Sequence, residues 1–325
     1  MRTWIFVPLI ALLATSARAQ DPSPVDRSLG WLARQQNDDG SWSLQGKGQG
    51  APEVASTGLA VLAFLGAGDT HKSGRYKKEV GTALRWLKMI QSAEGRLHVA
   101  GGSLRTHAIG ALALIEAYGL TGSPIFRTSA QSAADYTTRV LLETEAAKEL
   151  DAETAGWCLA ALKSAKVSGL KVDDRTFERC LARLDALTSD ADGTIGAKTA
   201  GDVAVGTAAA TIGRVFGGRD PNKDATVVRG AAHLARTLPK WEGAGVDPRY
   251  VYFGSLATFQ RGGDDWRAWS AALKDEIAAH QLTDGDDAGS WRLATDGSTK
   301  LGTVGSVAAL AMALEVCYRY DCVFR

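Results

Sequence analysis

The feature that most constrains this sequence is a unit of 46–52 residues that occurs six times. Each copy contains a run of small, mostly apolar residues with a glycine in the same register: Gly58, Gly110, Gly156, Gly206, Gly254 and Gly305. A regular period of this length is typical of repeat architectures in which each unit is one supersecondary element. The six units cover nearly all of residues 25–320, and no linker interrupts them, so a single domain is predicted.

Each unit is predicted to contain two helices of different character. The first, as in residues 76–91, carries charges on one face and apolar residues at i, i+3 and i+4, which is typical of a helix with one wet face. The second is Ala, Gly, Leu and Val almost all round, which indicates burial on every side. Six such hairpins predict an all-α (α/α)6 toroid, in which glycine-bearing helices form an inner ring. A closed ring is favoured because an open solenoid would need polar caps.

The segment GWLARQQNDDGSW, residues 30–42, resembles the QW-type repeat of squalene, hopene and oxidosqualene cyclases and of protein prenyltransferase β-subunits. Gln36 and Trp42 fit that pattern, and Gln281 and Trp291 repeat it with inserted residues between them. The chain is thus similar to the terpenoid cyclase and protein prenyltransferase family of α/α toroids. The resemblance implies that the glutamine and tryptophan tie an outer helix to the following loop. It also implies a functional cavity at the N-terminal ends of the inner helices.

The catalytic motifs of this family are matched poorly. Hopene-type cyclases protonate their substrate with Asp-x-Asp-Asp, which occurs here at residues 284–287 and makes Asp286 and Asp287 the candidate acids. The match lies in a polar loop before the last inner helix, and Asp and Gly are also common in ordinary turns. The Asp-x-Cys zinc motif of prenyltransferases and the Gly-Cys-Gly-Glu-Gln thioester motif are absent. The inner helices are expected to lack the aromatic lining that carbocation chemistry requires, so the balance favours a protein that is not an enzyme.

Charged residues nevertheless gather where the inner helices begin. Positions five residues before the register glycines are Glu53, Arg105, Asp151, Gly201, Arg249 and Lys300. With their neighbours they give a predicted ligand-binding set of Arg105, His107, Asp151, Glu153, Asp202, Arg249 and Tyr252. Capping and the helix dipole explain acids at these places, but they do not explain arginines. A mixed-charge rim around a pocket is therefore predicted.

No cofactor is predicted. His107, Glu153 and Asp202 belong to consecutive repeats, and an imidazole with two carboxylates is an acceptable zinc or acid–base set, so these three are the candidate metal ligands. Cys158, Cys180, Cys317 and Cys322 allow three disulfide pairings in an exported protein, or they remain four free thiols.

The N-terminus is predicted to be a cleaved signal peptide, residues 1–19. A basic Arg2, an apolar stretch over residues 4–14 and the small-x-small site ending at Ala19 form its three parts. The protein is therefore expected to be secreted or periplasmic, with residues 20–325 as the mature domain. That domain keeps 35 of the 37 Lys and Arg residues against 36 acidic ones, which argues against a nucleic-acid partner. No later stretch is apolar enough to predict a membrane span.

Three functional hypotheses remain open from the sequence, and the third is a purely structural repeat scaffold. The first is an exported, noncatalytic toroid that binds a ligand or a protein partner at the cavity rim. The alternative is an enzyme, either isoprenoid cyclase-like or similar to polysaccharide lyases and hydrolases, for which Arg105 with Asp151 or Arg249 with Asp202 are candidate pairs. A deep apolar pocket would favour isoprenoids, an open polar groove would favour sugars, and a plugged centre would favour a scaffold.

Overall fold

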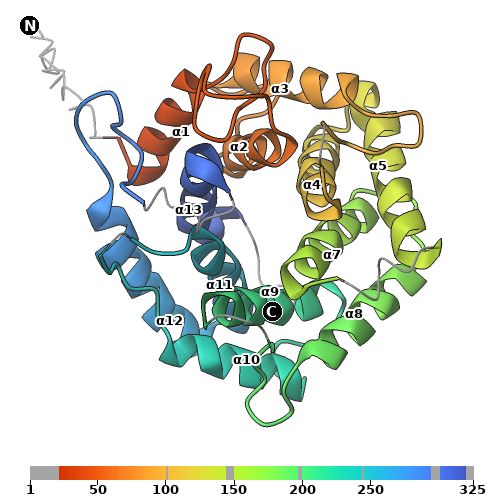
Figure 1. Ribbon diagram of the computed structural model, residues 1–325, viewed down its shortest axis with the longest axis vertical. Coiled ribbons are helices and arrows are strands. Elements are labelled where there is room, and N and C mark those ends of the chain that lie inside the picture. The colour runs from red at the N-terminus through yellow and green to blue at the C-terminus, as the bar shows by residue number, and fades with distance from the viewer. Residues whose placement is uncertain are drawn as a thin grey trace, which may run out of the picture.

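A computed structural model describes residues 22–99, 102–143, 150–196, 200–243, 245–293 and 301–319. Their twelve α-helices form two concentric rings, which Figure 1 shows along the toroid axis. The outer ring consists of α1 (Pro24–Arg34), α3 (Lys77–Met89), α5 (Pro124–Glu143), α8 (Arg175–Leu187), α10 (Ala225–Arg236) and α12 (Gly263–Ala272). The inner ring consists of α2 (Val54–Gly66), α4 (Leu104–Thr121), α7 (Ala152–Val167), α9 (Ala200–Phe216), α11 (Pro248–Arg261) and α13 (Gly302–Arg319). The predicted (α/α)6 toroid is confirmed.

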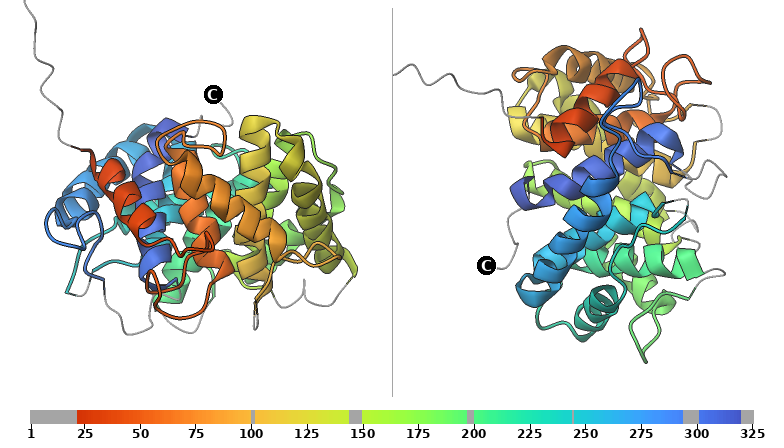
Figure 2. Two further views of the ribbon diagram at one scale, coloured as in Figure 1. Left: turned by 90° about the horizontal axis from the view of Figure 1, so that it is seen from above. Right: turned by 90° about the vertical axis from the view of Figure 1, so that its left-hand side faces the viewer.

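The ring is closed. Each inner helix packs against the next one along the chain, and α13 packs against α2. Figure 2 shows the two rings from the side, and α1 of the first repeat packs against α13 of the last. Polar contacts join the last repeat to the first: Nε2 of Gln281 donates to the carbonyl of Pro24 and to Oγ of Ser28, each at 2.8 Å. Residues more than 250 positions apart thus form the same joint as neighbouring repeats do, in which a glutamine after one outer helix hydrogen-bonds to the next outer helix.

The recurring geometry of these joints explains the glutamine and tryptophan of the repeat. Nε2 of Gln36 donates to the carbonyls of Gly40 and Glu79, each at 2.9 Å, and thereby ties the loop after α1 to the next outer helix. Nε1 of Trp42 donates to the carbonyl of Leu32 at 2.8 Å. The outer helix, its following loop and the next outer helix are therefore held by two side chains, as the family resemblance implies.

The glycine of the joint is required by its backbone. Gly289 has φ +98°, a region that L-residues rarely adopt, and a Cβ there would overlap the carbonyl oxygen of Arg27 on the neighbouring helix. The inner ring uses glycine for close approach instead. A Cβ on Gly58 of α2 would lie 3.1 Å from Cα of Gly110 on α4. Small residues thus let inner helices pack tightly.

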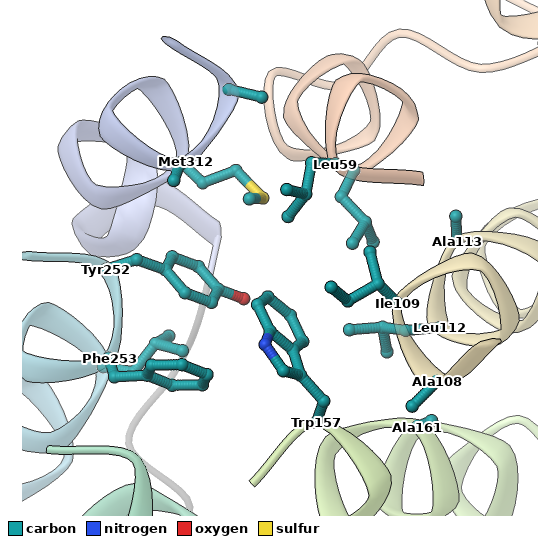
Figure 3. Close-up of a cluster of buried hydrophobic side chains, with 14 of the residues drawn as sticks. Leu59, Ala108, Ile109, Leu112, Ala113, Trp157, Ala161, Tyr252, Phe253 and Met312 are labelled. Atoms are coloured by element: carbon teal, nitrogen blue, oxygen red, sulfur yellow. The ribbon is translucent and has the colours of Figure 1, made fainter. Parts of the chain in front are cut away.

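The centre of the inner ring is filled by side chains (Figure 3). Trp157 of α7 stacks on Tyr252 of α11 with ring centroids 5.3 Å apart, and Phe253 meets the same indole at 5.0 Å. Leu59 of α2 and Met312 of α13 point toward them, and all five side chains are buried. The expectation that the inner helices lack aromatic residues at the centre is wrong. The small residues elsewhere on these helices leave the space that the three rings occupy.

In the described ranges, no helix combines the length and the apolar character that crossing a bilayer requires. Cys158 and Cys180 are buried free thiols. Cys317 belongs to α13, but its side chain lies outside the described residues, as do Cys322, Lys300 and the predicted signal peptide.

Candidate functional site

A cavity of about 410 Å³ lies at the N-terminal ends of the inner helices α4, α7, α9 and α11. Its charged lining comprises Arg105, Asp151, Glu153, Arg183, Asp202 and Arg249. Five residues of the predicted ligand-binding set therefore line one space, the rim cavity. They meet because each lies at the start of an inner helix, and all of these helices begin at the same face of the toroid.

Glu153 is the centre of the charged network in the rim cavity. Its Oε2 lies 3.1 Å from Nη1 of Arg105 on α4 and 3.1 Å from Nη1 of Arg249 on α11, so arginines from the two sides share one carboxylate oxygen. Both Glu153 and Arg249 are buried. The other oxygen, Oε1, is buried and has no hydrogen-bond partner among the described residues. A carboxyl with one uncommitted oxygen is thus held rigidly beside the cavity.

Two further carboxylates flank this centre. Nη2 of Arg105 contacts Oδ2 of Asp151 at 2.7 Å, which forms one of the two pairs predicted for a lyase, and Nη2 of Arg249 contacts Oδ2 of Asp247 at 2.7 Å. Both aspartates are helix N-caps. Asp151 accepts a hydrogen bond from the backbone N–H of Thr154 at 2.7 Å, and Asp247 caps α11 in a similar way. Capping fixes each carboxylate, and each carboxylate then orients an arginine toward Glu153.

The environments displace the pKa values of two neighbouring carboxyls in opposite directions. Burial raises the pKa of Glu153, and the adjacent Arg105 and Arg249 offset this only in part. Burial alone would also raise the pKa of Asp151, but Arg105 and the hydrogen bonds from Thr154 outweigh it and lower that pKa. The rim cavity therefore contains one carboxyl that keeps its proton more readily than usual and one that loses it more readily.

His107 lies outside the rim cavity. Its Nδ1 accepts a hydrogen bond from the backbone N–H of Leu97 at 3.0 Å, and its Nε2 faces the carbonyl of Ala133 at 3.2 Å. Burial lowers its pKa to about 4, so the ring is neutral and serves to join the loop before α4 to α5. Among the described residues, no group of three or more His, Cys, Asp and Glu side chains is placed to hold a metal ion. This replaces the expectation that His107 joins Glu153 and Asp202 as metal ligands.

Tyr252 also lies outside the rim cavity. It belongs to the same helix as Arg249, but its ring turns into the centre of the toroid and stacks on Trp157 (Figure 3). The sequence-based prediction selected the residue five positions before each register glycine, together with residues close to it. It could not resolve which side of the first helical turn faces the cavity, because adjacent residues on a helix point about 100° apart.

The candidate acids of the Asp-x-Asp-Asp match are exposed on the outer ring. Asp286 and Asp287 lie in the loop between α12 and α13, and Arg34 of α1 donates through Nη2 to the carbonyl of Ala288 in this loop at 2.8 Å. Neither aspartate lines the rim cavity. The match is therefore an exposed surface turn, and the acids hypothesised at residues 284–287 lie apart from the rim cavity.

Two residues of the site were missed from the sequence. Asp247 stands directly before Pro248, and an Asp before a helix-starting proline is a recognisable N-cap signal. Arg183 comes from the outer helix α8, where it donates to the carbonyl of Leu150 at 2.8 Å. The repeat pattern gave no signal for Arg183, because the sequence predicts that the outer helices do not line the cavity.

Comparison of this chain with known proteins finds solved structures of similar fold. The sequence matches no family model and no curated protein sequence. Among solved structures, an α-1,6-mannanase of Salegentibacter is similar with a TM-score of 0.62 and 12% identity over 90% of this chain and 98% of that chain. A cellobiose 2-epimerase from Bacillus thermoamylovorans has a TM-score of 0.63 and 12% identity, covering 89% of this chain and 96% of the other.

A type II terpene cyclase from Scytonema is similar with a TM-score of 0.58 and 15% identity, covering 90% of this chain and 96% of that one. At such identities the likeness shows the fold alone. The protein is an α/α toroid that resembles terpene cyclases and carbohydrate-active enzymes in architecture.

Proposed function

We propose that this protein is a carbohydrate-active enzyme whose substrate binds in the rim cavity, with Glu153 as the general acid. The observation that carries the proposal is the geometry of Glu153, which Arg105 and Arg249 hold at the wall of the rim cavity with Oε1 unpartnered among the described residues; the raised pKa of Glu153 and the lowered pKa of Asp151 agree with it. Pairs of carboxyls whose environments separate their pKa values are typical of acid–base assignments in enzymes that cleave glycosidic bonds.

The roles follow from the contacts. Glu153 would donate its proton to the leaving glycosidic oxygen, since burial favours its protonated form and Oε1 has no protein partner among the described residues. Asp151 stays ionised beside Arg105 and would accept a proton from water or from a sugar hydroxyl. Asp202 of α9 lines the same cavity and supplies a further carboxyl. The arginines would hold Glu153 in place and bind sugar oxygens.

The architecture favours a polar substrate over an isoprenoid. Charged side chains are prominent in the lining of the cavity at the rim, and the space below it is filled by Trp157 and Tyr252. An isoprenoid chain would need an apolar pocket, whereas the rim cavity carries six charged side chains beside its apolar ones. Two of the similar structures, the mannanase and the epimerase, bear names that refer to sugars, which supports the same direction by fold analogy.

The test is turnover of a panel of oligosaccharides that includes α-1,6-mannotriose and cellobiose, followed by chromatography of the products. Glu153→Gln should lower turnover of the substrate found by about 10²- to 10⁴-fold, which is the usual contribution of a general acid. The double variant Asp286→Asn/Asp287→Asn is the matched control, because it removes two carboxylates outside the cavity. Its turnover should equal that of the wild type.

Three outcomes would contradict the proposal. If Glu153→Gln retains full turnover, the general acid lies elsewhere. If sugars bind but no product forms, and Arg105→Ala and Arg249→Ala abolish the binding, the protein is a noncatalytic binder that uses the same rim. Absence of both binding and turnover across the panel would exclude a carbohydrate ligand.

A further inference from the structure

A second concave site lies on the outside of the toroid, between α3 and the start of α5, which are neighbours in the outer ring (Figure 1). It is a groove of about 640 Å³, lined by five basic side chains and closed on one side by Ile125 and Phe126. The basic residues are His71, Arg75, Lys77, Lys78 and Arg85. This site, the α3 groove, shares no lining residue with the rim cavity.

Among the described residues, the arginines and lysines of the α3 groove have no acidic partner. Residues 71–91 contain six Lys and Arg residues and a single acid, Glu79, although the whole chain is nearly neutral. Within the described part of the chain, no carboxylate lies within 4.0 Å of the charged nitrogens of Arg75, Lys77, Lys78 or Arg85. In the rim cavity, by contrast, Arg105 and Arg249 each contact two carboxylates. Unpaired cations around a concave surface raise the local concentration of anions.

His71 adds an independent sign of a missing partner. Both of its ring nitrogens are buried, and neither has a hydrogen-bond partner among the described residues. The ring is held edge-on against Phe126, with centroids 4.9 Å apart. Buried polar atoms are nearly always paired, so the His71 ring leaves hydrogen-bonding capacity at the wall of the groove that no described residue uses. Burial and the nearby Lys72 and Lys77 lower the pKa of His71, so the neutral ring has one N–H to donate.

The floor of the groove is open because Gly81 lies there. A Cβ on Gly81 would stand 3.5 Å from Nη1 of Arg85 and 3.8 Å from Cβ of His71. Those are ordinary contact distances, so alanine would fit, but a larger side chain would occupy the groove. Lys72 and Lys88 flank it, and their Nζ atoms donate to the carbonyls of Thr121 and Ile125 at 2.7 and 3.2 Å.

We propose that the α3 groove binds a phosphate-bearing ligand, with Arg75, Lys77, Lys78 and Arg85 as its cationic contacts and the ring of His71 as part of its wall. A ligand with one carboxylate would neutralise only one of these four cations. A phosphate ester or diphosphate carries more negative charge and more acceptor oxygens. Arginine matches phosphate oxygens in pairs, and lysine contacts them as a point charge. The phosphate can belong to a free anion or to a phospholipid headgroup, and the experiment separates these sources.

The experiment measures binding of two probes to the full-length mature protein. Calorimetry with inorganic pyrophosphate tests the free anion, and co-sedimentation with phosphatidylcholine vesicles containing about 30% phosphatidylglycerol tests the headgroup. The triple variant Arg75→Gln/Lys77→Gln/Lys78→Gln removes three cations of the groove. The triple variant Lys223→Gln/Lys240→Gln/Lys274→Gln removes three exposed lysines near α10 and α12, across the toroid, and is the matched control.

At least one probe should bind the wild type, and its Kd should rise about tenfold or more in the groove variant while the control stays within about twofold. Gly81→Leu, which keeps every charge but fills the floor, should also weaken binding, and circular dichroism should show that it folds. Pyrophosphate binding alone would identify a free phosphate ligand, and vesicle binding alone would identify a headgroup. The proposal is overturned if neither probe binds at about 1 mM, or if the groove variant binds as tightly as the control.

Discussion

The rim and the centre of the toroid interior are built from the same helices but have opposite chemistry. On α7, Glu153 belongs to the charged network of the rim cavity, and Trp157, one turn further along, lies in the apolar centre. On α11, Arg249 and Phe253 repeat the same change over one turn. The inner ring therefore passes from paired charges to packed aromatic rings within about 5.4 Å along the helix axis, the length of one turn.

This difference assigns separate duties to the two layers. The centre excludes water and supplies apolar burial, which stabilises the ring. The rim keeps charged groups that cost desolvation energy and that are retained only where they are paired. A site for a polar ligand is consequently shallow and restricted to the helix N-termini. Three measurements can break or sharpen this division.

The largest effect is expected at the centre. Trp157→Ala should reduce the free energy of unfolding by about 3–5 kcal/mol, because it removes a buried indole and leaves a cavity that the rigid ring cannot fill. Urea denaturation measures it. Met89→Ala on the outer face of α3, where the side chain is 71% exposed, should change stability by less than about 0.5 kcal/mol. Equal effects at both positions would mean that the centre is not packed as a core.

A smaller loss is expected at the rim. Arg249→Met should reduce the free energy of unfolding by about 3 kcal/mol, because it leaves Glu153 and Asp247 short of a buried partner. Arg175→Met is the control, since Arg175 pairs with Asp173 at 2.6 Å on the surface and such pairs contribute about 0–1 kcal/mol. If Arg249→Met proves as stable as the wild type, the network does not hold the helix starts together.

The smallest effect is a pH dependence. The pKa of Glu153 lies above its ordinary value of 4.5, so the folded state retains this proton to higher pH than the unfolded chain does. The native state then binds more protons between 4.5 and the raised value, and its stability falls as the pH rises through that window. Glutamine does not titrate. Glu153→Gln should therefore gain stability relative to the wild type as the pH rises from 4.5 through the raised pKa, by about 1.4 kcal/mol for each pH unit by which that pKa is raised. Urea denaturation at a series of pH values measures it.

Asp151 provides the control of opposite sign. Its pKa lies below the ordinary 3.8, so it contributes stability above that pH, and this contribution is lost as the pH falls through the lowered value. Asp151→Asn should accordingly lose stability relative to the wild type as the pH rises through that acid window. Parallel pH profiles for the two variants would contradict the assignment of acid and base roles.

The repeat made most of the fold predictable. The spacing of the register glycines indicated six hairpins, and the apolar character of the second helices placed them inside. Five residues of the rim set were found because a repeat brings equivalent positions to one face. The predictions for His107 and Tyr252 failed for a common reason: a position on the first turn of a helix does not state which way the side chain turns. The excess of Lys and Arg in residues 71–91 can be read from the sequence, but the sequence does not reveal that several of these side chains line one groove.

By itself, the sequence determined the number of hairpins, the inner and outer rings and the end of the toroid where charges gather, because periodicity and hydrophobic pattern are local properties that repeat. Only the tertiary structure decided which charges pair, which aromatic rings fill the centre and which cations on α3 lie without a carboxylate among the described residues. Those outcomes depend on contacts between helices that are distant in the chain, and burial and pKa values are set by such contacts rather than by neighbours in sequence.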